Sequence, residues 1–329
     1  MSRAPYLVTG ATGFVGRHLL HAHAADGAEP RVLALVRNPR DWSRQAWTAE
    51  LASVEVVEGS VTEPERFAPD LPPLGGIFHL AAVVRHSRRD PAELYATNVE
   101  GTLHMVRLAA AHRCRLVVVS TSGTVGCFET PGERADEHAP YVEETVGSWP
   151  YYDSKIRLER RARALAAELG VDLVIIRPPV LLGPGDHRLR STSTVLKAIR
   201  RKLPFTIRGG MHFADVRDAA QALLRAMKHP EARAIYHIEG TECTIEAFFG
   251  MIEEISGVPR PPLVLPYRPA WLLARTLERF HLVPDPVVVE MAARYWGARS
   301  LYAHADLGYK PRDPRETLRD TVEWLRAHA

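Results

Sequence analysis

The sequence predicts an α/β protein with a doubly wound parallel sheet and a smaller, mostly helical second domain. Strand-like apolar runs alternate with helix-like stretches through the first two-thirds of the chain. The runs are nearly continuous in Val, Ile and Leu, which is typical of parallel strands that are covered by helices on both faces. Repeated strand–helix units of this kind build a doubly wound sheet.

The expected elements follow one another without internal repeats or low-complexity tracts. The apolar runs predict strands at residues 6–9, 31–36, 54–58, 76–81, 115–120 and 172–177. Helical periodicity is present at residues 14–26, 40–51, 91–112 and 151–169. The pattern changes after "RPPVLLGPGD" (177–186), where we expect helices at 193–202 and 215–228, a strand at 234–239, and three or four further helices.

This order predicts two coupled domains. The nucleotide-binding domain is expected to comprise residues 1–178 plus about 213–240, because the strand at 234–239 returns to the large sheet. The substrate-binding domain is expected to comprise residues about 179–212 plus 241–329.

The composition is that of a soluble globular protein. The chain has 329 residues, of which 46% are apolar and 25% are charged, and its net charge is +3. No apolar run approaches the roughly 18 residues that suggest a membrane span, and the start lacks a signal-peptide pattern. Three widely spaced cysteines favour a reduced, cytoplasmic protein, and the scattered arginines argue against nucleic-acid binding.

Three histidines near the start, His18, His21 and His23, do not predict a metal site. They have no cysteine or carboxylate partner in the pattern, and His21 and His23 point to different faces of the expected helix. We interpret them as an exposed histidine cluster, and we expect no metal.

A glycine turn follows the first expected strand. "VTGATGFVGRHLL" places Gly10, Gly13 and Gly16 between the strand and the first helix. Glycine lets the backbone approach a diphosphate closely, and the helix amino terminus offers free N–H groups and a positive dipole end. The spacing is GxxGxxG instead of GxGxxG, and its place in a strand–turn–helix unit predicts dinucleotide binding.

The end of the second expected strand favours NADP(H) over NAD(H). An acidic residue at this position binds the adenosine ribose hydroxyls, whereas a guanidinium suits a ribose 2′-phosphate. The strand ends "LALVRNPR", with Arg37 at this place and Arg40 nearby. The alternative is that both arginines are solvated loop charges.

A hydroxyl-rich stretch and a Tyr–Lys pair predict a proton relay. "STSGTVG" (120–126) follows the fifth strand, and "YYDSK" (151–155) follows about thirty residues later. Tyr151 and Tyr152 lie four and three residues before Lys155, so either ring can share its helix face. A nearby ammonium is expected to lower the pKa of a tyrosine, and Ser122 is placed to polarise a carbonyl.

These motifs together resemble an extended short-chain dehydrogenase/reductase of the epimerase/dehydratase superfamily. The matching stretches fall in the family's order and cover most of the chain: "TGATGFVG", "HLAA" (79–82), "NVEGT" (98–102), "STSGTVG", "YYDSK", "RPPVLLGPGD" and "HFADVRDAA" (212–220). The resemblance implies a Rossmann domain and assigns Ser122, Tyr151 and Lys155 as the catalytic residues. It leaves Tyr152 as a packing residue.

The resemblance also implies a set of cofactor contacts. Asn98 matches a family asparagine that supports the sheet and often a proton-relay water, and Pro178 is expected beside the nicotinamide. The whole expected cofactor set is Gly10, Thr12, Gly13, Phe14, Val15, Gly16, Arg37, Ser60, Val61, Leu80, Ala81, Ala82, Asn98, Tyr151, Lys155 and Pro178.

Two departures from the family pattern affect the site. Val125-Gly126-Cys127 replaces the usual Val-Tyr-Gly, which is expected to leave space above the nicotinamide region. Gly59-Ser60-Val61 replaces a frequent Gly-Asp, so Ser60 and the Val61 backbone are expected to contact the adenine.

The branch of the family indicates a reductase. "RPPVLLGPGD" lacks the asparagine that sugar-nucleotide epimerases and dehydratases commonly carry there, and "TSGTV" lacks the dehydratases' acidic pair. "RPPVLLGPGD" and the ending "ADLGYKPRDPRETLRDTVEWL" (305–325) are similar to dihydroflavonol-reductase-like and hydroxysteroid-dehydrogenase-like members. The expected reaction is reversible NADPH-dependent reduction of a ketone or aldehyde, such as a 3-oxo acid or a hydroxysteroid-type compound.

The substrate residues are predicted from their places beside the crevice. Arg85, His86, Arg88 and Arg89 are candidates for an acidic substrate, which His187, Arg188 and Arg190 are placed to join, although a solvated loop explains the same charges. The expected substrate set is Val83, Arg85, His86, Gly123, Thr124, Val180, His187 and Arg188.

Two alternative functions stay open. One is a sugar-nucleotide epimerase or dehydratase that uses the same relay with a tightly bound NAD. The other is a non-catalytic protein that senses NADP(H), against which the intact Ser–Tyr–Lys set argues. The resemblance further implies a homodimer formed through the helices at 91–112 and 151–169.

Overall fold

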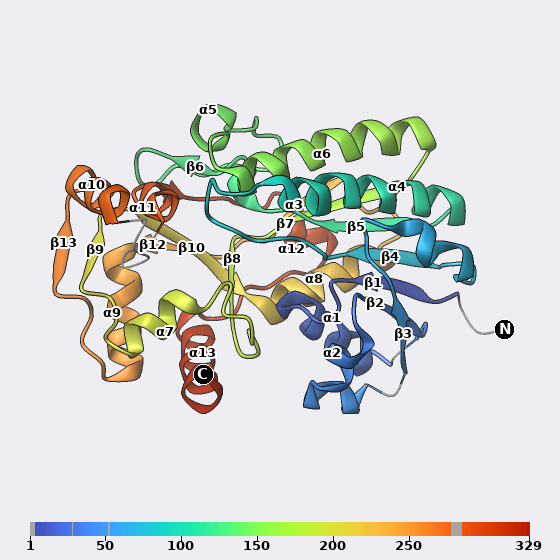
Figure 1. Ribbon diagram of the computed structural model, residues 1–329, viewed down its shortest axis with the longest axis horizontal. Coiled ribbons are helices and arrows are strands. Elements are labelled where there is room, and N and C mark those ends of the chain that lie inside the picture. Colours follow the sequence, from blue (N-terminus) through green and yellow to red (C-terminus); the bar gives the residue numbers. More distant parts are fainter. Residues whose placement is uncertain (1–3, 28, 52, 278–284) are drawn as a thin grey trace.

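The computed structural model describes residues 4–27, 29–51, 53–277 and 285–329, and it is built around a seven-stranded parallel sheet (Figure 1). The strand order is β11-β7-β5-β4-β1-β2-β3. Its strands are β1 (Tyr6–Thr9), β2 (Val32–Val36), β3 (Val54–Glu58), β4 (Gly76–His79), β5 (Arg115–Val119), β7 (Leu173–Arg177) and β11 (Ile235–His237). The predicted doubly wound sheet is confirmed, including the return of the strand near residue 235.

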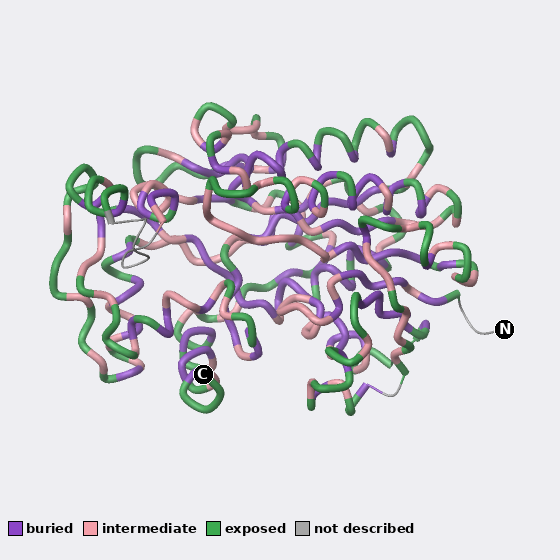
Figure 2. The backbone as a smooth tube through the Cα atoms, in the orientation of Figure 1, coloured by how far each residue is buried: buried purple, intermediate pink, exposed green. Residues whose placement is uncertain are grey.

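Helices cover both faces of this sheet, which is why its strands are apolar on both sides. Leu116 and Val118 of β5 pack in one core cluster, and Val117 between them packs in the other. The first cluster is completed by α4 (Gly101–His112) and α6 (Pro150–Leu169), and the second by α1 (Phe14–Ala25) and α8 (Val216–Lys228). The buried purple tube in Figure 2 runs through the strands between these two layers.

The second part of the molecule lies at the end opposite the N-terminus (Figure 1). It holds the three-stranded sheet β12-β10-β8 and two small sheets, β13-β9 and β14-β6. The strands are β6 (Cys127–Phe128), β8 (Val180–Leu182), β9 (Phe205–Ile207), β10 (Gly210–Asp215), β12 (Thr241–Thr244), β13 (Leu263–Leu265) and β14 (Tyr295–Trp296). The helices are α7 (Ser193–Ile199), α9 (Ile245–Ser256), α10 (Tyr267–Leu277), α11 (Pro286–Ala292) and α13 (Pro314–His328). The short helix α12 (Ala303–Asp306) lies beside α8 instead, and its Ala303 packs in the core cluster that holds α1 and α8.

Two predicted helices are interrupted. The expected helix at 40–51 consists of α2 (Pro39–Ser43) and a 3₁₀ turn (Ala46–Glu50). The expected helix at 91–112 begins as α3 (Ala92–Tyr95) and passes through a π-helical turn (Ala96–Glu100) before α4. Single π turns inside helices are rare and often occur at functional sites, and this one carries Asn98.

The remaining elements are short. They are α5 (Glu143–Val146) and the 3₁₀ turns Pro64–Arg66, Ala68–Asp70 and Ser122–Thr124. β6 pairs with β14, so the segment after β5 reaches the C-terminal part of the chain. The two-domain division stays a prediction, and its expected boundary at residue 213 falls inside β10.

Candidate active site

The glycine turn between β1 and α1 accepts only glycine at two positions. Gly10 has φ +69°, and a Cβ there would lie 2.7 Å from the backbone nitrogen of Ala81. A Cβ on Gly16 would lie 2.3 Å from the Gly10 oxygen. The 12-residue α1 begins at Phe14 after the N-cap Gly13, and no side chain caps its first N–H groups. These N–H groups at a helix amino terminus therefore fit a dinucleotide diphosphate.

A buried hydrogen-bond chain fixes the end of β4 against this turn. Thr9 Oγ1 accepts from the backbone nitrogens of Leu80 and Ala81, each at 3.2 Å, and it donates to His79 Nδ1 at 2.8 Å. The Thr102 hydroxyl donates its proton to the Asn98 carbonyl oxygen. Thr102 Oγ1 therefore accepts from His79 Nε2, at 3.0 Å. Burial lowers the pKa of His79 to about 3, so its ring is neutral.

Asn98 joins the loop after β4 to the start of α6. Its Oδ1 accepts from the Val83 nitrogen at 2.8 Å, and its Nδ2 donates to the Val83 oxygen at 3.0 Å and to Ser154 Oγ at 3.1 Å. Ser154 Oγ in turn donates to the Tyr151 carbonyl oxygen at 2.7 Å. Asn98 thus positions the helix turn that carries Tyr151.

Ser122, Tyr151 and Lys155 meet at the carboxyl end of β5. Lys155 Nζ donates to the carbonyl oxygen of Val119 at 2.9 Å and lies 5.9 Å from the centroid of the Tyr151 ring. Ser122 begins the 3₁₀ turn that packs on α6, and its nitrogen donates to the Pro178 oxygen at 2.9 Å. Within the described residues the hydroxyls of Ser122 and Tyr151 form no hydrogen bond, so both are free for a ligand.

The pKa of Tyr151 differs from the expectation. Burial raises it to about 12, whereas the pattern predicted a decrease caused by Lys155. Burial also lowers the pKa of Lys155 to about 8, and Glu159 opposes this decrease. At neutral pH Tyr151 is therefore a phenol, which is the form that donates a proton.

A buried ion pair lies one turn beyond Lys155 and was not singled out from the sequence. Arg177 Nη2 donates to Glu159 Oε2 at 2.5 Å, and the two side chains are 2% and 0% exposed. Ser120 and Tyr141 hydroxyls also donate to Glu159. The spacing of Tyr151, Lys155 and Glu159, each four residues apart, was the available signal.

Tyr152 is a packing residue in the structure. It is 7% exposed and stacks on Trp296 with ring centroids 5.2 Å apart. The Tyr151 and Tyr152 rings contact each other with centroids 5.2 Å apart, and the His86 ring packs against both, 5.4 Å from Tyr151 and 6.3 Å from Tyr152. A Cβ on Gly123 would lie 2.3 Å from Tyr152 Cε1, so the turn after β5 is pressed against this aromatic stack.

Two expectations about the stretch after β5 are wrong. No open space lies beside Gly126, because a Cβ there would be 2.3 Å from the carbonyl oxygen of Gly297. Thr124 does not face a substrate, because it is 0% exposed and its hydroxyl donates to the Thr121 oxygen and to Glu159.

The predicted anion site for a substrate is also not assembled. Arg85 pairs with Glu93, and Arg88 pairs with Glu290, so carboxylates already compensate both charges. The candidates from the loop after β8 lie elsewhere: Arg188 donates to Thr12 of the glycine turn, and His187 contacts Arg17 of α1. Val180, at the start of β8, is 40% exposed.

The adenosine end of the predicted cofactor site is more open. Arg37 and Arg40 are exposed, and neither forms an ion pair with a described residue. Ser60 Oγ shares a hydrogen bond with Thr62 at 2.8 Å. The Val61 carbonyl accepts from His104, and the adenine contact of the Val61 backbone stays a prediction.

The histidines of α1 are not an exposed cluster. His23 is 3% exposed and donates to the Pro30 oxygen, and His18 donates to the Pro184 oxygen at 2.7 Å. Within the described ranges no group of three or more metal-ligating side chains is gathered, and no helix is long and apolar enough to cross a membrane.

Comparison with known proteins agrees with this geometry. The model of the NAD dependent epimerase/dehydratase family matches residues 6–238, which ends directly after β11. The chain belongs to this family. It is therefore an NAD(P)-dependent enzyme that acts on CH–OH or carbonyl groups.

Several known proteins are similar to this chain over nearly its whole length. A putative dihydroflavonol 4-reductase from Synechocystis is 29% identical over 98% of this chain and 95% of its own length. Sterol demethylase protein B from Methylococcus capsulatus is 28% identical over 97% and 98%. The crystal structure of gox2253 has a TM-score of 0.83 at 28% identity and covers 99% of both chains. UDP-glucose 4-epimerase of Thermotoga maritima, at 20% identity and TM-score 0.76, covers 98% of this chain and 99% of its own and shares the fold.

Proposed function

We propose that the protein is an NADPH-dependent reductase of a ketone or aldehyde. The observation that carries the proposal is the pair of unpartnered hydroxyls, Ser122 and Tyr151, beside the buried Lys155. When bound, the reduced nicotinamide supplies the hydride. Ser122 donates a hydrogen bond to the carbonyl oxygen, and Tyr151 gives that oxygen its proton. The Lys155 ammonium stabilises the phenolate that this transfer leaves on Tyr151.

Three arginines support NADPH as the reductant. Arg37, Arg40 and Arg44 follow β2, and none of them forms an ion pair with a described carboxylate. A guanidinium at the end of the second strand suits a ribose 2′-phosphate, for which a carboxylate would be repulsive.

The named relatives support reduction over sugar-nucleotide chemistry. The relative from Synechocystis is named a putative dihydroflavonol 4-reductase, and one from Streptomyces, 29% identical over 94% of this chain, is named a 3-diazoavenalumate denitrifying reductase. The sugar-nucleotide epimerases and dehydratases among the similar structures are 16–21% identical, so they support the fold alone. A homodimer through α4 and α6 and a cytoplasmic location stay predictions.

The test is a screen of NADPH and NADH oxidation with ketones, aldehydes, 3-oxo acids and 3-oxosteroids. Tyr151→Phe is expected to lower kcat by about 10²–10⁴-fold while NADPH still binds, because the proton donor is lost. Tyr152→Phe is the matched control and is expected to retain activity. Turnover by Tyr151→Phe at the wild-type rate would contradict the proposal. Purified protein with stoichiometric NAD and activity without added cofactor would favour an epimerase or dehydratase instead.

A further inference from the structure

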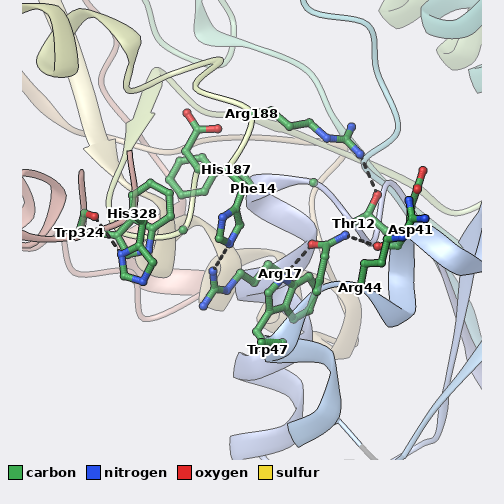
Figure 3. Close-up of a pocket in the computed structure, with 15 residues that line it drawn as sticks. Thr12, Phe14, Arg17, Asp41, Arg44, Trp47, His187, Arg188, Trp324 and His328 are labelled. Carbon is green, nitrogen blue, oxygen red and sulfur yellow. Dashed lines mark hydrogen bonds between the residues drawn. The ribbon is translucent and has the colours of Figure 1, made fainter. Parts of the chain in front are cut away.

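A cavity of about 550 Å³ opens beside the glycine turn. Its lining comes from the turn and α1, from α2 and the 3₁₀ turn after it, from the loop between β8 and α7, and from α13 (Figure 3). None of the catalytic residues Ser122, Tyr151 and Lys155 lines it. The cavity therefore lies apart from the proposed catalytic residues and includes Thr12, Gly13 and Phe14 of the predicted cofactor site.

The cavity carries excess positive charge. Arg17, Arg44 and Arg188 line it, and none of the three forms an ion pair with a carboxylate in the part of the chain that the structure describes. Asp186 also lines the cavity; its buried carboxylate accepts from the backbone nitrogens of residues 190–192 and from the Thr192 hydroxyl, and it forms no ion pair with the three arginines. Asp41 is the one exposed carboxylate among the lining residues. Three guanidinium groups outnumber the two lining carboxylates, Asp41 and Asp186, which favours the binding of an anion.

The loop between β8 and α7 holds Arg188 against the glycine turn. Arg188 Nη2 donates to Thr12 Oγ1 at 3.2 Å, and Figure 3 shows its side chain reaching toward Thr12 beside Asp41 and Arg44. His18 donates to the Pro184 oxygen at 2.7 Å, which fastens the loop to α1. The backbone that carries Arg188 is thus anchored before any ligand binds, although the side chain itself is exposed.

The topology identifies the anion that fits between Thr12 and Arg44. β1 and β2 are adjacent and parallel, so the glycine turn and the start of α2 lie at the same edge of the sheet. In this type of fold the ribose 2′ position of a dinucleotide lies at the end of the second strand. A 2′-phosphate at this place would have the Thr12–Arg188 contact on one side and Arg44 on the other.

We propose that Arg188, together with Arg44, binds the 2′-phosphate of NADP. This inference rests on the proposed function and deepens it, because it assigns part of the cofactor selectivity to a loop outside the large sheet. Planar guanidinium groups bind phosphate with two parallel hydrogen bonds, and the phosphate displaces the weaker bond from Arg188 to the neutral Thr12 hydroxyl. NADPH, but not NADH, then ties the loop between β8 and α7 to the glycine turn.

The experiment measures dissociation constants by titration calorimetry, which does not depend on a carbonyl substrate. The ligands are NADPH, NADH, adenosine 2′,5′-bisphosphate and ADP. Arg188→Ala is expected to weaken NADPH and the bisphosphate by about tenfold, the size of one charge-assisted hydrogen bond, and to leave NADH and ADP within about twofold. Arg44→Ala is expected to act in the same direction. Arg190→Ala is the matched control, because it is an exposed arginine of the same loop that does not line the cavity, and it is expected to change none of the four constants.

Two results would overturn the inference, and two others separate it from the proposed function. Equal weakening of NADPH and NADH by Arg188→Ala would place the guanidinium on the diphosphate that both share, and it would overturn the inference. Wild-type affinity of Arg188→Ala for the bisphosphate would overturn it as well. If Arg37→Ala loses the preference for NADPH while Arg188→Ala keeps it, the proposed function stands and this inference fails. If the wild-type protein shows no preference for NADPH, the NADPH proposal itself fails.

Discussion

The charged residues differ in burial between two regions of this protein: the predicted catalytic corner around Lys155 and the exposed corner that is proposed to bind the adenosine phosphate. Lys155, Glu159 and Arg177 are nearly or fully buried, and each has a protein partner within hydrogen-bond distance. Arg37, Arg40, Arg44 and Arg188 are exposed and have no carboxylate partner among the described residues. The fold itself therefore supplies the partners of the buried charges around the predicted catalytic Lys155. The exposed arginines, for which a role in cofactor binding is proposed, have no such partner from the fold among the described residues.

This difference has a physical reason. A buried charge without a partner is far more costly than an exposed one, so a catalytic lysine that must be shielded from water needs partners that the fold supplies. An exposed guanidinium is solvated by water, so leaving it without a protein partner destabilises the fold little, and it stays available for a phosphate. Mutations at the two corners should therefore separate effects on stability from effects on cofactor affinity.

The largest effect is expected from Glu159→Ala. It leaves Arg177 buried without its carboxylate, which should lower the free energy of unfolding by about 3–5 kcal/mol. The measurement is denaturant unfolding followed by circular dichroism. The matched control is Glu143→Ala, which breaks the exposed pair between Glu143 and Arg160 and should cost no more than about 1 kcal/mol. Equal losses from the two variants would show that burial does not distinguish these pairs.

A smaller loss of stability is expected from Gly126→Ala. The new Cβ would meet the Gly297 carbonyl, which belongs to the backbone and can move little, and such overpacking costs about 1–3 kcal/mol. Gly250→Ala is the control, since this position in α9 has no atom closer than 3.8 Å to a new Cβ. It should stabilise by about 0.5–1 kcal/mol. Unchanged stability of Gly126→Ala would show that the C-terminal segment is not pressed against the turn after β5.

The catalytic corner should also give the reaction its pH dependence. The pKa of Lys155 is lowered to about 8 by burial, and the mechanism needs the protonated ammonium, so kcat/KM for reduction should fall as the pH rises through about 8. The fall should approach tenfold per pH unit above that value. Tyr151, with a pKa of about 12, keeps its proton throughout this range and cannot cause the decrease. A flat profile between pH 7 and about 10 would argue against a role for the Lys155 charge.

The large sheet and the glycine turn were predictable because their signals are local. Strands with both faces apolar, such as β5, predict a parallel sheet that is covered by helices on both faces. Glycine is required at position 10 because φ is positive there and the Ala81 backbone is close. The family pattern selected Tyr151 over Tyr152, and the structure buries Tyr152 in an aromatic stack. The catalytic and cofactor roles of these residues stay predictions.

The remaining features depend on contacts between distant segments, which periodicity does not encode. Arg177 reaches Glu159 only because β7 lies beside α6, and Gly297 fills the space at Gly126 from the far end of the chain. The π turn at Asn98 is a change of hydrogen-bond register that composition does not reveal. The decrease predicted for the pKa of Tyr151 was wrong because burial, which the sequence does not quantify, dominates the lysine charge.

The smallest effect is expected from salt, and it tests the exposed corner alone. Raising the ionic strength from about 0.1 M to about 1 M shortens the Debye length from about 10 Å to about 3 Å, which screens exposed charges far more than buried ones. The affinity for NADPH should therefore fall a few-fold more than the affinity for NADH, because only NADPH brings a phosphate to the exposed arginines. The same titration with Arg188→Ala should show a smaller salt effect on NADPH, while Arg190→Ala keeps the wild-type effect. If salt weakens the affinities for NADPH and NADH equally, the exposed arginines do not bind the 2′-phosphate. The difference in burial between the two corners then has no influence on the preference between NADPH and NADH.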